Sequence, residues 1–360
     1  MEKQSGENPL KIYNKIVGCI LGTAIGDSIG LPREGLSPAR AARIFGMTDI
    51  TQNFIFGYGM VSDDTEHTIM VAQSLIESGA EPDLFAKCLS KRIKRWFLQI
   101  PAGIGWATLR SGIKLILGWN YNHSGVMSAG NGPAMRSAII GVSIANDELR
   151  DQLVRISTRM THIDDRALEG ALLVARWASL ASRNCDSKLP IDMLEDIANQ
   201  TLRHPAWSDP MRMVFETVRQ KMPSSAYIQR CGLEKGVSGY IVSTIAAAAY
   251  CWLSNISDFR ASITAVMQLG GDTDTVGAIV GGLAGAHLGE SGVPSDWLDG
   301  LIEWPRSVSW MQTLSERLAE LVRNSTSGQP PSHLPVTICR NAVFTSIIIL
   351  HGFRRLFPPY

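Results

Sequence analysis

The spacing of apolar residues predicts helices along most of the chain. Downstream of Ser62, apolar residues follow the i, i+3, i+4, i+7 spacing of one buried helical face, and residues 164–180 repeat that spacing. Residues 242–253 and 276–288 are apolar on nearly all sides, which predicts helices at the centre of a bundle. Strand patterns are scarce, and the best candidate, Asn53–Phe56, lies in a connector. We therefore expect an all-α fold.

Glycines recur every four residues in the second of these apolar segments, at Gly277, Gly281, Gly285 and Gly289. This spacing leaves one helix face without side chains, so that a neighbouring backbone can approach closely. The same spacing occurs in helix pairs of membranes, but an apolar stretch of about fourteen residues is too short to cross a bilayer. We therefore expect close packing inside a globular core and no stable insertion into a membrane.

A polar segment rich in Gly, Pro and Ser separates the main part of the chain from its C-terminal end. We expect one domain over residues 12–323, a linker at 324–332 and an apolar tail at 333–360. The tail contains the apolar run 341–350. It can be a helix docked on the bundle, a contact between subunits or an anchor on a membrane surface. An apolar run of this length suits a buried element better than a membrane span, so a docked helix is our prediction.

Composition and charge narrow the functional classes. The chain has 45% hydrophobic and 19% charged residues, as is usual for a globular protein with a sizeable core. With 34 Lys and Arg against 33 Asp and Glu, the formal net charge is +1, so no basic excess favours nucleic acid or an anionic membrane. The six cysteines form no Cys-x-x-Cys pair, and the polar N-terminus lacks the apolar core of a signal peptide. We therefore expect a cytoplasmic protein with reduced thiols and no nucleic-acid partner.

Two short segments combine acidic and hydroxyl side chains just before predicted helices. The first is Ser62-Asp-Asp-Thr65 and the second is Gly270-Gly-Asp-Thr-Asp-Thr275. Either segment alone can be explained as a helix cap, because Ser and Asp satisfy free backbone N–H groups and acids complement the helix dipole. A cap needs only one residue, however, and each segment supplies four consecutive side chains that carry oxygen.

The chemistry of these side chains favours a hard divalent cation. Asp272 and Asp274 lie two residues apart in a turn introduced by glycines, which allows both carboxylates to face one point. Carboxylates held close together repel one another unless they are protonated or neutralised by a cation. Oxygen ligands without a nearby His or Cys pair suit Mg²⁺ or Mn²⁺ better than Zn²⁺. An EF-hand is excluded because its twelve-residue spacing and terminal Glu are missing.

In their order along the chain, six short motifs resemble those of the ADP-ribosylglycohydrolase family, which includes the dinitrogenase-reductase-activating glycohydrolases. The resemblance runs from about Ile16 to Gly289, and six motifs in one order make it highly specific. The motifs are Gly26-Asp-Ser-Ile-Gly30 followed by Glu34, Ser62-Asp-Asp-Thr65, Ser128-Ala-Gly-Asn-Gly-Pro-Ala-Met-Arg136, Thr161-His162, Val237-Ser-Gly-Tyr240 and Gly270-Gly-Asp-Thr-Asp-Thr-Val-Gly277.

The resemblance implies an orthogonal multi-helix bundle with a dinuclear centre of two Mg²⁺ or Mn²⁺ ions in a central cleft. The metal ligands that it implies are Ser62, Asp63, Asp64, Asp272, Asp274 and Thr275. Glu34 matches a loop acid that family members place beside the scissile bond, as a general base or as a carboxylate that bridges water and metal. Together with Asp63 and Asp274, it forms the implied catalytic set.

The remaining motifs match the cradle in which the family holds ADP-ribose. The implied substrate contacts are Gly130, Asn131, Gly132, Arg136, His162, Ser238, Gly239 and Tyr240. Backbone N–H groups of the turn at 128–133 can approach phosphate oxygens, although an ordinary surface turn has the same composition. Arg136 can also be a salt-bridged structural residue, His162 a plain helix-start residue, and 237–240 either an ordinary helix start or a phosphate-binding one.

One departure from the family pattern concerns the segment Pro101–Gly105. The dinitrogenase-reductase branch carries an acid near the substrate in a Pro-x-Asp-Ile-Gly segment, and Gly103 stands in place of that Asp. The family pattern therefore predicts that this acid is either dispensable here or replaced by Glu34.

The resemblance implies a metal-dependent hydrolase that cleaves the N-glycosidic bond between ribose C1″ and a protein side chain and releases ADP-ribose. ADP-ribosyl-arginine is the linkage we expect. The alternatives are ADP-ribosyl-serine, O-acetyl-ADP-ribose, a phosphohydrolase reaction at two metals, and a protein that only binds ADP-ribose. The expected partner is an ADP-ribosylated protein, and a role as an immunity protein would add an ADP-ribosylating toxin. Both acidic segments are present, which favours catalysis over binding alone, because unneutralised carboxylates are costly to bury.

Overall fold

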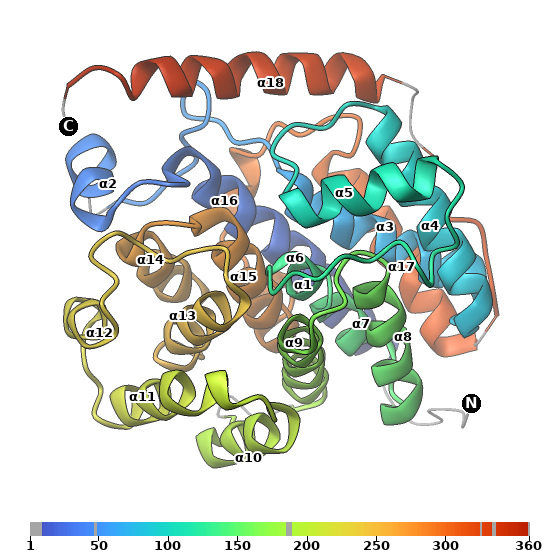
Figure 1. Cartoon of the computed structure of the whole chain (residues 1–360), viewed down its shortest axis with the longest axis horizontal. Coiled ribbons are helices and arrows are strands. Elements are labelled where there is room, and N and C mark those ends of the chain that lie inside the picture. Colours follow the sequence, from blue (N-terminus) through green and yellow to red (C-terminus); the bar gives the residue numbers. More distant parts are fainter. Residues whose placement is uncertain (1–8, 47–48, 185–188, 325, 333–335, 359–360) are drawn as a thin grey trace.

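Helices form most of the chain in the computed structural model, which describes residues 9–46, 49–184, 189–324, 326–332 and 336–358 (Figure 1). Within these ranges the only β-type pairings are isolated bridges between loops, so the expected all-α fold is confirmed. The helices of the first half are α1 (Pro9–Gly30), α2 (Pro38–Phe45), α3 (Asp63–Ser78), α4 (Pro82–Leu98), α5 (Trp106–Ile116), α6 (Gly132–Met135), α7 (Ala138–Ser143), α8 (Asp147–Arg159) and α9 (Asp165–Arg183). Those of the second half are α10 (Ile191–Thr201), α11 (Ser208–Arg219), α12 (Ser224–Cys231), α13 (Ile241–Leu253), α14 (Phe259–Leu269), α15 (Thr273–Leu288), α16 (Ser295–Asp299), α17 (Val308–Asn324) and α18 (Thr337–Arg354). Short 3-10 helices occupy Leu31–Arg33, Pro205–Trp207 and Glu290–Gly292.

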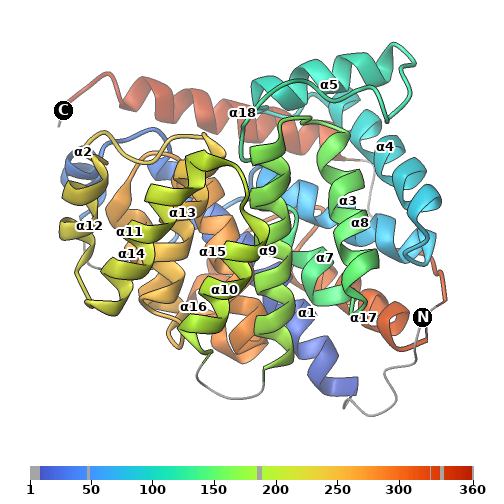
Figure 2. The ribbon, with the colours of Figure 1, turned by 60° about the horizontal axis from the view of Figure 1, so that its bottom comes forward.

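The glycine-striped helix α15 packs against α1 at the centre of the molecule (Figures 1 and 2). A Cβ atom on Gly281 would lie 2.0 Å from the carbonyl oxygen of Gly22, and one on Gly285 would lie 1.9 Å from that of Gly18. The contacting residue numbers rise along α15 as they fall along α1, so the two helices are antiparallel. The stripe therefore packs closely inside the core, and its partner is a second helix with the same glycine spacing.

Helix α1 is long and apolar enough to cross a membrane by length and composition, yet 94% of the relevant window is buried inside the fold. Ile16, Ile20 and Ile25 are completely buried. Its apolar character is therefore that of a core helix, surrounded by α3, α15 and α17.

The C-terminal tail forms helix α18, which lies along one edge of the bundle and runs from the side of α5 toward that of α2 (Figures 1 and 2). Phe344 and Ile347 pack with Leu31, Phe54 and Met60 in a small apolar cluster that is separate from the main core. The buried Arg340 forms an ion pair with the buried Glu303, with 2.6 Å between nitrogen and oxygen. Asn341 donates a hydrogen bond to the carbonyl oxygen of Gln99 at 2.9 Å. Both apolar and polar contacts thus hold α18 on the bundle.

Candidate functional site

The two acidic segments meet at the starts of α3 and α15. Ser62 caps α3 by accepting a hydrogen bond from the backbone N–H of Asp64, while its hydroxyl lies 3.0 Å from Asp64 Oδ2. Thr275 Oγ1 lies 3.4 Å from the same carboxylate oxygen and so joins the two segments. Asp272 stands at the cap position of α15 but makes no side-chain capping bond, which leaves its carboxylate available for other contacts. Capping therefore accounts for Ser62 but not for Asp272.

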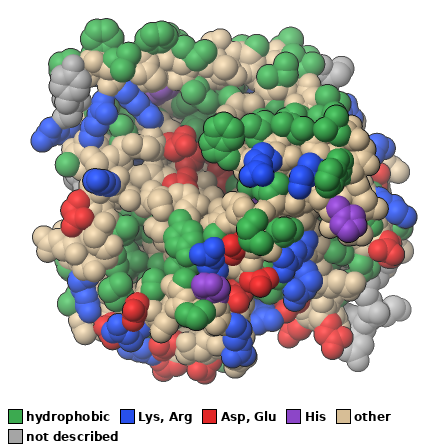
Figure 3. All heavy atoms as spheres, viewed as in Figure 1, with side chains coloured by type: hydrophobic (Ala, Val, Ile, Leu, Met, Phe, Trp, Pro, Cys, Tyr) green, Lys and Arg blue, Asp and Glu red, His purple; other side chains and the backbone are tan. Residues whose placement is uncertain are grey.

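Acidic side chains gather at the floor of a hollow below α18 in the space-filling view (Figure 3). Burial is the largest effect on Asp63, Asp64 and Asp274, and it raises the pKa of each well above its ordinary value. Repulsion between the carboxylates adds to this effect. The charges of Asp27 and Glu34 raise the pKa of Asp63, and those of Asp272 and Asp64 raise the pKa of Asp274. The carboxyl groups are therefore concentrated in one desolvated space, where ionising them is costly without a cation.

The donor atoms fit a hard divalent cation. Asp64 Oδ1 and Asp274 Oδ1 are buried and have no hydrogen-bond partner, which is costly for a carboxylate unless a proton or a cation satisfies it. In the described part of the chain, however, no three Asp, Glu, His or Cys side chains already form a closed ligand set. The structure thus brings together the candidate ligands Ser62, Asp63, Asp64, Asp272, Asp274 and Thr275, and the two unpartnered oxygens are donor atoms that a divalent cation would satisfy.

Asp27 is a further acid of this cluster that was not among the predicted site residues. It lies on α1 and is completely buried. Its carboxylate accepts hydrogen bonds from the backbone N–H of Ser62 at 2.9 and 3.0 Å and from Thr65 Oγ1 at 2.5 Å. Burial raises its pKa to about 7 even though these hydrogen bonds act to lower it. Asp27 therefore holds the start of α3 in place and adds a charge beneath the candidate ligands. The signal in the sequence was an acid between Gly26 and Gly30, inside an otherwise apolar helix face.

Glu66, also in the first turn of α3, has a different environment. Arg306 Nη1 lies 2.8 Å from one carboxylate oxygen, and Trp96 Nε1 donates to the other at 2.6 Å. Burial acts to raise the pKa of Glu66, but Arg306 and Arg340 outweigh it and the pKa falls below the ordinary value. Both oxygens are satisfied, so Glu66 supports α3 and is not a candidate ligand.

Glu34 lies on a loop that is attached to the start of the second acidic segment. The N–H of Gly35 donates to the carbonyl oxygen of Gly271 at 2.7 Å, and the N–H of Gly271 donates to that of Leu36 at 2.7 Å. The Glu34 side chain is exposed at the surface, but neighbouring elements shield it partly from water. This desolvation and the charge of Asp272 raise its pKa, while the charge of Arg355 acts to lower it. The structure thus places Glu34 at the rim of the carboxylate cluster, where the side chain can reach solvent and ligand alike.

The predicted substrate turn is joined to the carboxylate cluster by a series of loop contacts. Gly130 forms an antiparallel bridge with Tyr240, and the N–H of Asn131 donates to the carbonyl oxygen of Gly239 at 3.2 Å. Asn131 Nδ2 donates to Asp272 Oδ2 at 2.6 Å. A Cβ atom on Gly239 would lie 3.5 Å from that same carboxylate oxygen. Gly130, Asn131, Gly132, Ser238, Gly239 and Tyr240 therefore line one continuous wall beside the acids.

His162 and Arg136 lie behind this wall. The His162 ring is buried against Gly130 and Gly132, with a Cβ on Gly130 3.1 Å from Nε2, and burial lowers its pKa to about 3. His162 is therefore neutral and supports the turn. Arg136 is fully buried, and its guanidinium is engaged by Ser157, Thr161 and His67. The structure does not bring Arg136 to the surface of the site, so it supports the site from within rather than offering a free guanidinium to a phosphate.

Tyr240 is partly exposed at the other end of the wall. Its hydroxyl accepts a hydrogen bond from Arg166 at 3.3 Å, and the Arg166 guanidinium lies 5.6 Å from the ring centroid. Arg166 is in turn paired with Asp164 at 2.7 Å. The aromatic ring is thus held at the cleft edge by a fixed cation, which suits a surface for a ribose or a base.

Gly103 lies next to the cluster, as the family pattern implies for this position. A Cβ atom there would lie 3.8 Å from Asp63 Oδ1, and its φ angle of +79° is in the left-handed region that favours glycine. An acid at this position would therefore face Asp63 directly. Its absence leaves open space on that side of the cluster.

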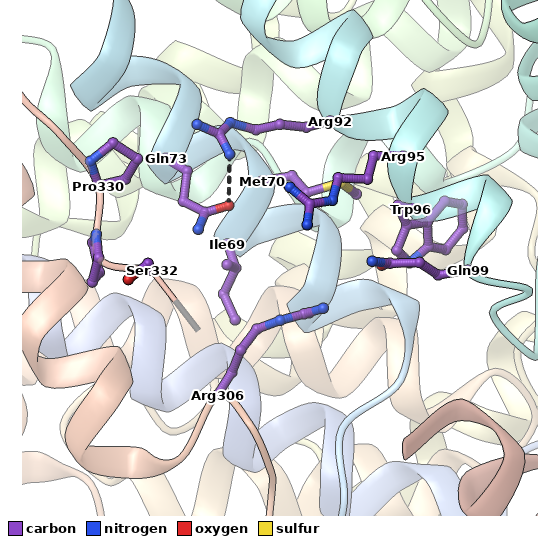
Figure 4. A pocket seen from close by; sticks show the side chains of 11 residues that line it. Ile69, Met70, Gln73, Arg92, Arg95, Trp96, Gln99, Arg306, Pro330 and Ser332 are labelled. Atoms are coloured by element: carbon purple, nitrogen blue, oxygen red, sulfur yellow. Dashed lines mark hydrogen bonds between the residues drawn. The ribbon is translucent and has the colours of Figure 1, made fainter. Parts of the chain in front are cut away.

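A second hollow lies between α3, α4 and the linker (Figure 4). Its volume is about 310 Å³, and Arg92, Arg95 and Arg306 point into it. Arg92 is paired with Glu77, and Arg306 with Glu66. This hollow is a salt-bridged groove and is distinct from the carboxylate cluster.

Comparison with known proteins agrees with the motifs. The family model of the ADP-ribosylglycohydrolases matches residues 8–328. A solved structure, described as an ADP-ribosylglycohydrolase-related protein complex, superposes with a TM-score of 0.65 at 27% identity and covers 87% of this chain and 99% of that one.

Three sequence relatives each align with most of this chain and over most of their own length. An uncharacterised protein of Archaeoglobus fulgidus is 30% identical over 316 residues, which are 85% of this chain and 96% of the relative. ADP-ribosylarginine hydrolase Tri1 of Pseudomonas putida is 26% identical, covering 87% of this chain and 79% of its own length. ADP-ribosyl-[dinitrogen reductase] glycohydrolase of Rhodospirillum rubrum is 24% identical, covering 81% and 91%.

Proposed function

The chain belongs to the ADP-ribosylglycohydrolase family and is a hydrolase of ADP-ribosylated substrates, and from this we propose its metal and its linkage. It is a Mg²⁺- or Mn²⁺-dependent enzyme that cleaves ADP-ribose from arginine side chains of proteins. The observation that carries the metal requirement is the pair of buried, unpartnered oxygens on Asp64 and Asp274, within a group of mutually repelling carboxylates. Two ions held by Ser62, Asp63, Asp64, Asp272, Asp274 and Thr275 would satisfy these oxygens and remove the repulsion.

Residues of the chain itself would transfer the proton and orient the substrate. Bound divalent ions polarise water and stabilise negative charge in such reactions. Glu34 stands at the edge of the cluster with a raised pKa, which makes its carboxylate a stronger base for the proton of the water that attacks ribose C1″. Asp63 and Asp274 are the other acids placed to hold a proton there. The Asn131 amide keeps Asp272 oriented toward the wall that would hold the ribose.

The substrate wall supports recognition of ADP-ribose next to the cluster. Ser238 and Gly239 are exposed beside Asp272, and Tyr240 offers an aromatic face at the edge. Backbone N–H groups and small residues let an anionic, hydroxyl-rich ligand approach the chain closely. His162 keeps the opposite turn rigid from beneath.

A protein target is supported by apolar side chains close to the cleft. Trp106 follows the Gly103–Gly105 segment and is 81% exposed, and Met127, directly before the turn at 128–133, is also exposed. Large aromatic side chains of this kind are enriched where proteins bind other proteins. Arginine as the linkage rests on similarity to the relative named ADP-ribosylarginine hydrolase. Reversal of the action of an ADP-ribosylating toxin is one setting for such an activity.

The test compares linkages under defined metal conditions. Free ADP-ribose would be measured after incubation of the protein with ADP-ribosyl-arginine protein, ADP-ribosyl-serine peptide and O-acetyl-ADP-ribose, with Mg²⁺, with Mn²⁺ and with chelator. We expect metal-dependent release from the arginine substrate at the highest rate. Release from only the serine or ester substrate would refute the arginine assignment, and release of inorganic phosphate instead of ADP-ribose would refute glycoside hydrolysis.

A further inference from the structure

The C-terminal helix α18 reaches the rim of the carboxylate cluster, although it lies beyond the residues that match the family. Its last turn is tied to the N-terminal part of the site at several points. His351 Nε2 lies 2.5 Å from the carbonyl oxygen of Phe54, and the ring stacks on Phe54 with the centroids 5.2 Å apart. Arg40 on α2 donates a hydrogen bond to the carbonyl oxygen of Arg355. The end of this helix is thus held beside the loop that carries Glu34.

The partly buried Arg355 binds this loop before Glu34 and lies close to it after Glu34. Its Nη2 donates to the carbonyl oxygen of Pro32 at 3.2 Å, and its Nη1 lies 4.0 Å from where a Cβ of Gly35 would stand. Glu34 itself accepts no hydrogen bond from any residue in the described ranges, so its placement depends on the loop backbone. Burial lowers the pKa of Arg355 below its ordinary value, while the charges of Glu34 and Asp274 act in the opposite sense, so the guanidinium lies within electrostatic reach of both acids.

We propose that Arg355 is a positioning residue for the hydrolysis reaction, supplied by the C-terminal helix, which fixes the loop of residues 31–36 so that Glu34 faces the carboxylate cluster. The role in hydrolysis rests on the function proposed above. The fixing of the loop rests only on the contacts of Arg355. A hydrogen bond from a charged donor to a backbone carbonyl is stronger than a neutral one, and it spans elements that are far apart in the sequence.

The neighbouring Arg354 provides a matched control. It has the same charge and lies on the same turn, but it is exposed, and the bonds recorded for it run to the carbonyl oxygens of Phe357 and Pro358 at the end of the chain. Arg355→Gln and Arg354→Gln therefore remove the same charge from the same helix. Only the first removes the bond to the Glu34 loop. Arg355→Lys keeps a cationic donor and tests whether the bond, rather than the bulk of the side chain, is required.

Two measurements on the full chain test the proposal. In hydrogen exchange, the amides of Gly35 and Leu36 should exchange about tenfold faster in Arg355→Gln than in Arg354→Gln, because the loop opens more often. In ADP-ribose release, Arg355→Gln should lower kcat about tenfold with KM within about twofold, whereas Arg355→Lys should recover most of the rate and Arg354→Gln should match the wild type.

The outcomes separate the two levels of the proposal. Equal exchange in Arg355→Gln and Arg354→Gln would overturn the positioning role whatever the enzyme does. A rise in KM at unchanged kcat would also overturn it, because Arg355 would then bind substrate directly. Failure of the wild-type protein to release ADP-ribose would refute the proposed function, while the exchange experiment would still decide whether Arg355 fixes the loop.

Discussion

At the scale of single residues, the candidate site is defined by carboxylates that the fold brings closer together than their charges favour. Asp272 and Asp274 could be identified from their spacing after two glycines, and their counterparts Asp63 and Asp64 from the paired acids at a helix start. Asp27 stands in one of the motifs, but its role could not be identified, because that role depends on α1 passing beneath the start of α3. The buried position of Arg136 was equally invisible, since an arginine one turn beyond a glycine-rich turn has the same pattern whether it faces solvent or the core.

Replacing both Asp272 and Asp274 by Asn should abolish metal-dependent turnover. Loss of outer partners of metal ligands already costs about 10–100-fold, so loss of two ligands should lower activity at least about 100-fold. The variant should unfold at a higher temperature than the wild type in chelator, by about 2 °C or more, because two repelling charges are removed. Calorimetric Mn²⁺ titration and thermal unfolding measure both effects.

The matched control is the double variant Asp196→Asn and Asp299→Asn, which removes two charges from exposed positions. Its activity and its metal affinity should equal those of the wild type. Full activity in the Asp272 and Asp274 variant would contradict the metal-site assignment.

Introducing an acid at Gly103 should strengthen binding of the divalent ion. The new carboxylate would face Asp63, so we expect the Kd for Mn²⁺ to fall about tenfold. The left-handed φ angle should cost about 1 kcal/mol of stability. Gly105→Asp is the control, because Gly105 has an ordinary φ of −62° and no atom within 4 Å of an added Cβ. Equal Kd values for Gly103→Asp and Gly105→Asp would show that position 103 does not contact the site.

At the scale of elements, the antiparallel pair α1 and α15 holds the two halves of the site in register. The glycine stripe predicted a close helix contact from the sequence alone. Its partner could not be identified in that way, because spacing shows which face is bare but not which helix will meet it. The contact places Asp27 of α1 near Asp274 of α15, and this proximity is what creates the charge cluster.

Gly281→Ala should disrupt this contact. Its Cβ would lie 2.0 Å from the carbonyl oxygen of Gly22, which a backbone can relieve only by separating the two helices. We expect a loss of about 2–3 kcal/mol in the free energy of unfolding, measured by urea denaturation. Gly352→Ala in α18 is the control, since nothing lies within 4 Å of its added Cβ, and it should raise stability by about 0.5–1 kcal/mol. A neutral effect of Gly281→Ala would contradict the close packing.

At the scale of the whole molecule, the cluster makes the stability of the metal-free protein depend on pH. Burial raises the pKa of Asp27 from 3.8 to about 7, and the pKa values of Asp63, Asp64 and Asp274 rise as well. The folded state therefore holds protons that the unfolded state releases, and stability falls as pH rises through this window. Buried His67 and His162 have lowered pKa values and oppose this trend below about pH 6.5, so the comparison belongs above that pH.

In chelator, Tm should accordingly be higher at pH 7.0 than at pH 8.5. Added Mg²⁺ or Mn²⁺ should raise Tm more at pH 8.5, because an ion no longer has to displace protons. In the variant with Asn at both 272 and 274, Tm in chelator and the rise in Tm on adding the ion should both depend less on pH. A Tm in chelator that increases from pH 7.0 to pH 8.5 would contradict the proposed charge cluster.

The all-α class and the family could be recognised from the sequence because both depend on local spacing and on short motifs. The contribution of α18 could not, because an apolar tail beyond the family motifs has no pattern that says where it docks. Only the structure shows its last turn beside Glu34, through the contact of Arg355 with Pro32.

The most direct test of the central claim is the release of ADP-ribose from ADP-ribosyl-arginine protein by wild-type enzyme that has been stripped of metal and then resupplied with Mg²⁺ or Mn²⁺. The account predicts no release in chelator and restored release with either ion. Undiminished release in chelator would contradict a catalytic role for the carboxylate cluster as a metal centre.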